Sequence, residues 1–101
     1  MTLTIQWEAQ VRSDREAISR FLYQEAGLPV ASATGDRFVH VVGILKENPP
    51  AGTKAGKTDK QRKLVVPRFP FIIVYVTEDM TVRILRILHT SRKLTGRYLR
   101  S

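Results

Sequence analysis

The chain has 101 residues, 43% of them hydrophobic and 26% charged, which is the composition of a single soluble globular domain. It contains no cysteine and two histidines, so disulfides and cysteine-based zinc sites are excluded and a multi-histidine metal site is not expected. No apolar run reaches the roughly 18 residues of a transmembrane helix, and the first residues do not resemble a secretory signal. We therefore expect a cytoplasmic protein that needs no membrane, metal or cofactor.

The net charge of +8 is unevenly distributed along the chain. Residues 1–50 have five Lys/Arg and six Asp/Glu, whereas residues 51–101 have twelve and three, so the two halves carry −1 and +9. A positive field of this size favours a polyanion or an acidic protein as partner. The alternative is a solvated basic surface without a specific ligand.

The first part of the chain predicts a strand followed by a helix. Residues 2–7 alternate polar and apolar side chains, as a half-buried strand does. Ser13 and Glu16 have the spacing of a capping box, so a helix is expected to start there, or as early as Gln10, and to end before Gly27. The residues that we expect it to bury are Ala17, Ile18, Phe21 and Leu22, with either the stem of Glu25 or Ala26.

Residues 30–48 predict a second helix. The β-branched residues and two glycines of this segment oppose a helix. However, nearly twenty residues without a turn signal are too many for one strand. The two helices should form an antiparallel hairpin that ends at Pro49. The apolar residues at helical spacing are Phe38, Val41, Val42 and Leu45.

Residues 49–61 form a basic loop that contains a partial nucleotide-binding motif. Ala51–Thr58 (AGTKAGKT) fits a relaxed P-loop, with alanine in place of its first glycine. A P-loop requires a strand before it and a helix N-terminus after it, and the sequence offers prolines and a strand instead. We interpret the match as a coincidence.

The second half of the chain predicts three strands, at Arg62–Val66, Phe71–Thr77 and Val82–His89, each rich in β-branched or aromatic residues. The acidic break at residues 78–81 joins the last two as an antiparallel hairpin. The predicted fold is therefore α+β, an N-terminal strand and a two-helix hairpin packed on an antiparallel sheet (β-α-α-β-β-β). Residues 1–93 make one domain, and residues 94–101 are a basic C-terminal tail.

Three motifs of the strand region occur in a characteristic order. They are Arg62-Lys63-Leu64, then Pro70-Phe71-Ile72-Ile73-Val74-Tyr75, and then Leu88-His89 with Arg92 shortly after. With the preceding strand and two helices, they resemble the ParE/RelE superfamily of toxins from bacterial type II toxin–antitoxin pairs, and its ParE branch in particular. The resemblance covers the chain from about Ile5 to Lys93.

This resemblance implies a function, with one alternative. RelE-like members cut messenger RNA on the ribosome, whereas ParE-like members poison DNA gyrase. The ribonucleases carry a basic residue in the strand that has Phe71, Ile72 and Ile73 here, so the resemblance favours a binding toxin over an enzyme. Its partners would be a ParD-like antitoxin and gyrase, with operator DNA bound through the antitoxin complex. The alternative is a metal-independent ribonuclease that acts on ribosome-bound mRNA with His89, Arg92 and Tyr98.

The candidate contacts to a target or partner are all basic. By strand alternation, Arg86 should share a face with Val82, Ile84 and Leu88, and Arg83 should lie on the other face. For Arg86 a structural and a binding role are equally open, whereas for Arg83 the structural role is favoured. The candidate binding residues are Arg62, Arg68, Arg86, His89, Arg92 and Lys93.

Overall fold

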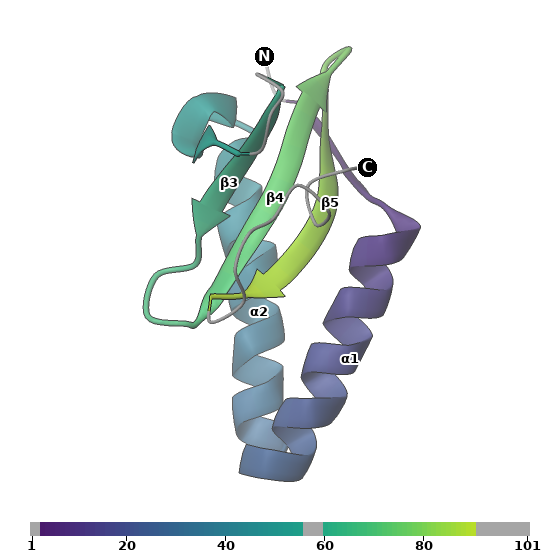
Figure 1. Cartoon of the computed structure of the whole chain (residues 1–101), viewed down its shortest axis with the longest axis vertical. Helices are drawn as coiled ribbons and strands as arrows, with labels where there is room; N and C mark the ends of the chain where they lie inside the picture. The colour runs from purple at the N-terminus through teal and green to yellow at the C-terminus, as the bar shows by residue number, and fades with distance from the viewer. Residues whose placement is uncertain (1–2, 56–59, 91–101) are drawn as a thin grey trace.

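The computed structural model describes residues 3–55 and 60–90, which form two helices packed on one face of a sheet (Figure 1). The sheet has the strand order β1-β5-β4-β3-β2. This architecture confirms the predicted α+β fold class. The elements are β1 (Thr4–Trp7), α1 (Ala9–Ala26), α2 (Leu28–Leu45), the 3-10 turn η1 (Pro49–Ala51), β2 (Thr53–Lys54), β3 (Gln61–Val65), β4 (Phe71–Glu78) and β5 (Thr81–His89).

The sheet differs from the expected meander in two ways. The segment predicted as a loop contributes β2, whose two residues pair with Lys63 and Arg62 of β3. In addition, β1 pairs with β5 in the parallel direction, so the sheet is mixed rather than wholly antiparallel. Alternation along β1 predicts that it is a half-buried strand, but it contains no information about strand direction.

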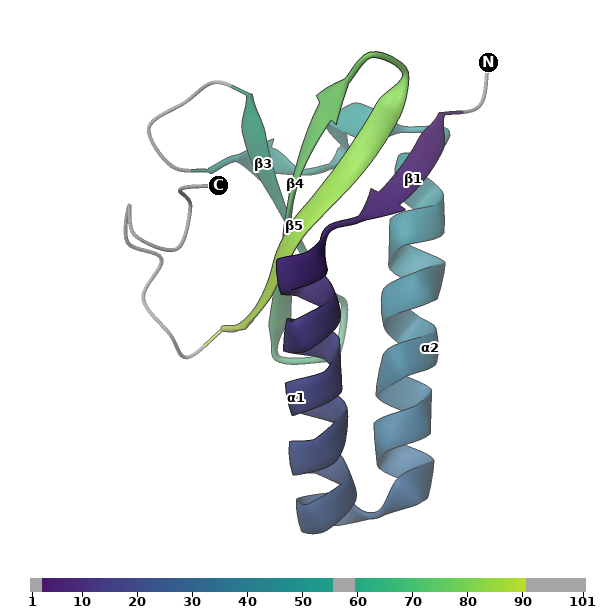
Figure 2. The same cartoon turned by 90° about the vertical axis from the view of Figure 1, so that its right-hand side faces the viewer.

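Both faces of the central strand β4 are apolar. Its residues Phe71, Ile73 and Tyr75 belong to the main core, which lies between the sheet and the helices. Ile72, Val74 and Val76 point to the other side, into a second cluster that contains no helix residue. Figure 2 shows both helices on the same side of the sheet. The main core also contains Val11, Phe38, Val41, Val42, Leu45, Val82, Ile84 and Ile87.

Helix α1 starts earlier than the capping motif predicted. The backbone N–H of Glu8 donates to Ile84 of β5, and the carbonyl of Glu8 accepts from the N–H groups of Val11 and Arg12. Pairing with β5 therefore fixes the first helical turn, and Ser13 lies inside the helix. The proposed capping box was wrong. The helix ends as expected at Gly27, whose φ of 91° suits glycine.

The side chains expected to be buried on α1 were predicted only in part. Ile18 and Leu22 are half-buried, whereas Ala17, Phe21, Glu25 and Ala26 are exposed. The C-terminal end of the helix extends beyond the sheet in Figure 1, so its apolar residues have no sheet to cover them. Val11, close to the sheet, is the buried residue of this helix.

Helix α2 agrees with its prediction. The four apolar residues at helical spacing are all buried in the main core. Pro29 lies in the first turn, where its missing N–H costs nothing, so it starts α2 as well as following α1. His40 is on the exposed side of the helix. No described helix is both long and apolar enough to cross a membrane.

A β-bulge changes the facing of residues along β5. Tyr75 of β4 lies opposite Ile84, and Val74 lies opposite Arg86, so Leu85 is the extra residue. Alternation is interrupted there, and Ile84 and Ile87 both face the main core. The expectation that Arg86 shares a face with Val82 and Ile84 was therefore wrong, whereas it holds for Leu88, because Arg86 and Leu88 pair with Val74 and Ile72 of the second cluster.

The β4–β5 turn is strained. Glu78 pairs with Thr81, so Asp79 and Met80 form a two-residue loop, with φ values of 47° and 63°. A type I′ turn requires positive φ at both positions and favours Asn-Gly. Met80 has a side chain where glycine is preferred.

Met80→Gly should raise the free energy of unfolding by about 1 kcal/mol, because it removes the cost of a left-handed non-glycine residue. Urea denaturation followed by circular dichroism measures the change. Met80→Ala retains Cβ and serves as the control, with stability within about 0.5 kcal/mol of the parent. If the glycine variant is no more stable than the alanine variant, the backbone at Met80 is not strained.

Candidate functional site

Arg62 belongs to a hydrogen-bonded network that anchors the segment before β2. The hydroxyl of the buried Tyr75 donates to the carbonyl of Pro49 at 2.6 Å and accepts from the N–H of Gly52 at 2.9 Å. Arg62 donates from Nη1 to the carbonyl of Gly52 at 2.8 Å. Burial raises the pKa of Tyr75, although the Gly52 N–H and the charge of Arg62 oppose this shift. Arg62 therefore has a structural role.

Arg86 is held by an acid that the sequence analysis did not single out. Its Nε and Nη2 donate to the two carboxylate oxygens of Asp14, at 2.8 and 3.0 Å. Oδ2 of Asp14 also accepts the backbone N–H of Ile87 at 3.0 Å. Because β1 pairs with β5 only as far as Ile84, this N–H has no partner on a neighbouring strand. The Asp14 side chain takes the place of that strand and joins α1 to β5.

Arg83 also has carboxylate partners at this edge of the sheet. It donates from Nε to Glu8 at 3.0 Å and forms a second, shorter contact to the same oxygen through Nη2. Its Nη1 lies 3.3 Å from Glu78. The hydrogen bond from Arg83 is the main reason why the pKa of Glu8 is lowered, and the pKa of Arg83 is raised by the same contact. Arg83 thus joins β5 to the segment between β1 and α1.

The other described candidates lie at the opposite end of the sheet from Arg62. His89 is exposed at the end of β5, and its ring meets Phe71 edge-on with centroids 5.5 Å apart. Arg68 is exposed in the turn between β3 and β4, with a φ of 68°. Arg92, Lys93 and Tyr98 lie outside the described residues. His89 and Arg68 therefore share the end of the sheet at which β4 begins, whereas Arg62 lies away from it.

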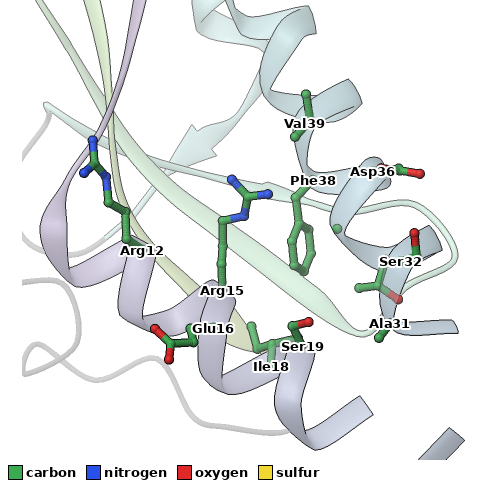
Figure 3. Close-up of a pocket in the computed structure, with 12 residues that line it drawn as sticks. Arg12, Arg15, Glu16, Ile18, Ser19, Ala31, Ser32, Asp36, Phe38 and Val39 are labelled. Atoms are coloured by element: carbon green, nitrogen blue, oxygen red, sulfur yellow. The ribbon is translucent and has the colours of Figure 1, made fainter. Parts of the chain in front are cut away.

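A groove of about 450 Å³ between α1 and α2 was not predicted (Figure 3). The guanidinium of Arg15 lies at its rim and stacks on Trp7, 4.6 Å from the ring centroid. The space stays open because α2 has small residues there, among them Ala31, Ser32 and Gly35. This run of small residues is the feature of the sequence from which the groove could have been predicted. In residues 3–55 and 60–90, no group of three metal-ligating side chains gathers. The lining residues are Arg12, Arg15, Glu16, Ile18, Ser19, Ala31, Ser32, Thr34, Gly35, Asp36, Phe38 and Val39.

Residues 5–94 match the model of the family described as the ParE toxin of the type II toxin–antitoxin system, parDE. The chain belongs to this family. The fold is similar to that of a solved chain titled "Chromosomal ParDE TA system from P. aeruginosa", with a TM-score of 0.77 and 21% sequence identity. The likeness covers 87% of this chain and 96% of the other. A search of curated proteins gives no significant match.

In this member of the ParE toxin family, the strand that distinguishes the two branches is apolar and buried. Phe71, Ile72 and Ile73 are at most 8% exposed. Phe71 and Ile73 lie in the main core, and Ile72 lies in the second cluster. A cation at any of these positions would lose its hydration without gaining a described acid. This part of the sheet therefore supplies apolar packing on both faces.

Gly52→Ala should lower the free energy of unfolding by about 2 kcal/mol, because the added Cβ would lie 2.5 Å from the carbonyl oxygen of Lys63 and 2.8 Å from the Tyr75 hydroxyl. Gly35→Ala is the matched control, since its Cβ meets nothing within 4 Å and helix propensity favours alanine by up to about 1 kcal/mol. Chemical denaturation of both variants gives the comparison. Equal effects would contradict the role of Gly52.

Asp14→Asn should lower the free energy of unfolding by about 1–3 kcal/mol, because it removes the ion pair with Arg86 and weakens the bond to Ile87. The two side chains are 10% and 25% exposed, so water replaces the lost interaction poorly. Glu16→Gln is the control. Its ion pair with Arg20 is 72% and 65% exposed, so we expect a change below about 0.5 kcal/mol. Thermal denaturation measures the stability of both variants. Similar losses of stability in the two would contradict the stabilising role of the Asp14 contacts to Arg86 and Ile87.

Proposed function

We propose that this chain is a toxin that binds and poisons DNA gyrase, acts without catalytic residues of its own and is neutralised by a ParD-like antitoxin. The observation that carries the proposal is the buried apolar segment Phe71–Ile73 of β4. Ribonuclease members of the wider superfamily have a basic residue in this strand to stabilise the transition-state phosphate. An apolar, buried segment cannot supply that charge.

The arginines with described partners support the same proposal. Arg62 donates to a backbone carbonyl, and Arg86 is held by Asp14, so both maintain the fold. General acid–base catalysis requires its groups to converge within hydrogen-bond reach of one phosphate. Arg62 and Arg86 lie away from His89 and are engaged in contacts within the fold, which favours recognition of a protein target over RNA cleavage.

The helical hairpin has the properties expected of an antitoxin-binding surface. The groove between α1 and α2 lies beside exposed apolar residues near the end of the hairpin, of which Phe21 and Leu28 are 59% and 64% exposed. Exposed apolar surface of this kind commonly marks a site for a partner. We propose that a segment of the antitoxin orders on this surface and that the operator is bound through the resulting complex, in the cytoplasm.

Two assays on the purified toxin test the proposal. We expect loss of gyrase supercoiling with accumulation of cleaved DNA, and intact messenger RNA on ribosomes under matched conditions. Addition of the cognate antitoxin should restore supercoiling, because it removes the free toxin.

The variant His89→Ala provides the internal control. If ribosome-bound RNA is cut by the parent and left intact by His89→Ala or Arg92→Ala, the chain is a ribonuclease and the proposal is wrong. Unimpaired gyrase together with intact RNA would also overturn it, because the toxin would then require another target.

A further inference from the structure

The two edges of the sheet differ in how their positive charges are balanced. At the β1–β5 edge, each arginine of β5 has a carboxylate partner, Arg83 with Glu8 and Glu78, and Arg86 with Asp14. At the β3 side, the sequence from Lys60 to Thr77 has four cations and no acidic residue. No described carboxylate pairs with Lys60, Lys63 or Arg68. The four cations, here called the basic edge, are Lys60, Arg62, Lys63 and Arg68.

The basic edge follows the length of β3. Lys60 precedes the strand, Arg62 and Lys63 lie within it, and Arg68 is in the turn that follows, so the charges are distributed from one end of the strand to the other. Arg62 keeps its full charge because its partner is the neutral carbonyl of Gly52. Arg37 of α2 adds another cation next to this turn, since it stacks on Phe69 at 5.6 Å.

We propose that the basic edge binds the phosphate backbone of DNA directly and without sequence preference. A five-residue strand is about 17 Å long. The phosphates of one DNA strand are spaced by about 3.4 Å along the helix axis, so a segment of this length spans about five of them. Arg62 lies opposite Tyr75 and Lys63 opposite Val74, so of these two side chains only Lys63 is on the face away from the helices. The basic edge thus matches the phosphates in charge and in spacing. Contacts to phosphates position a protein on DNA but do not distinguish one base from another.

An acidic protein segment fits this edge less well. Protein partners usually anchor apolar side chains in a well-packed patch. In β3 and the following turn, Val65 is the large exposed hydrophobic residue, at 56%. The strand β2 covers Arg62 and Lys63, which leaves only the last two residues of β3 open to an added strand. Phosphates need neither an apolar pocket nor a free strand.

The test measures binding of the full-length toxin to a labelled DNA duplex of about two helical turns, across salt concentrations from about 50 to 200 mM. The edge variant is Lys60→Gln/Lys63→Gln/Arg68→Gln, which leaves Arg62 and its network intact. The control variant is Arg12→Gln/Arg20→Gln/Lys46→Gln, with two positions on α1 and one directly after α2. Both lose three positive charges, so their net charges are equal. Circular dichroism verifies that both remain folded.

The slope of log K against log salt should fall in magnitude by about 2.7 in the edge variant, or 0.9 for each lost phosphate contact, and remain near the parent value in the control. Equal slopes in the two variants would overturn the proposal, as would absence of DNA binding by the parent. Binding of polyglutamate but not DNA, lost in the edge variant, would assign the edge to an acidic protein instead. Gyrase is absent from this experiment, so its result is independent of the proposed target.

Discussion

The two-sided burial of β4 is the constraint on which the rest of the structure depends. Six consecutive residues, Phe71 to Val76, are buried, with alternate side chains in the main core and in the second cluster. Burying apolar side chains on both faces of one strand stabilises the fold and excludes charge from the middle of the sheet. The one polar group there, the hydroxyl of Tyr75, is bonded to Pro49 and Gly52.

Because charge is excluded from the centre, the described cations of this basic chain lie away from β4, on the other strands, in turns and on the helices. At one edge, Glu8 and Asp14 neutralise the arginines of β5 and join α1 to the sheet. These contacts also occupy part of an open strand edge, which limits unwanted pairing with other chains. At the other edge, none of the carboxylates that the structure describes pairs with the cations of β3, and their field remains available to a polyanion.

Two of the arginines in the sheet have structural roles, and the surfaces open to partners lie elsewhere. Arg62 stabilises the loop before β2, and Arg86 joins helix α1 to β5. The apolar surface of the helical hairpin and the basic edge of β3 lie on different parts of the molecule. An antitoxin, a protein target and DNA could therefore be recognised by separate surfaces.

Local patterns in the sequence were enough to predict the kind and the order of the main elements, because periodicity and turn residues act locally. The four buried residues of α2, the end of α1 at Gly27 and the three long strands were all predictable on that basis. Of the candidate sites, the sequence identified the basic residues but not their roles. Asp14 and Arg86 are 72 residues apart, and no local pattern relates them.

The parallel pairing of β1, the start of α1 and the bulge at Leu85 could not be predicted from local patterns. Each of these results from contacts between segments distant in the sequence, such as the bond from Glu8 to Ile84. The pairing of charged side chains also depends on contacts between segments distant in the sequence. Whether an arginine is neutralised depends on which carboxylate the fold brings within about 4 Å, because the attraction weakens with distance and solvent.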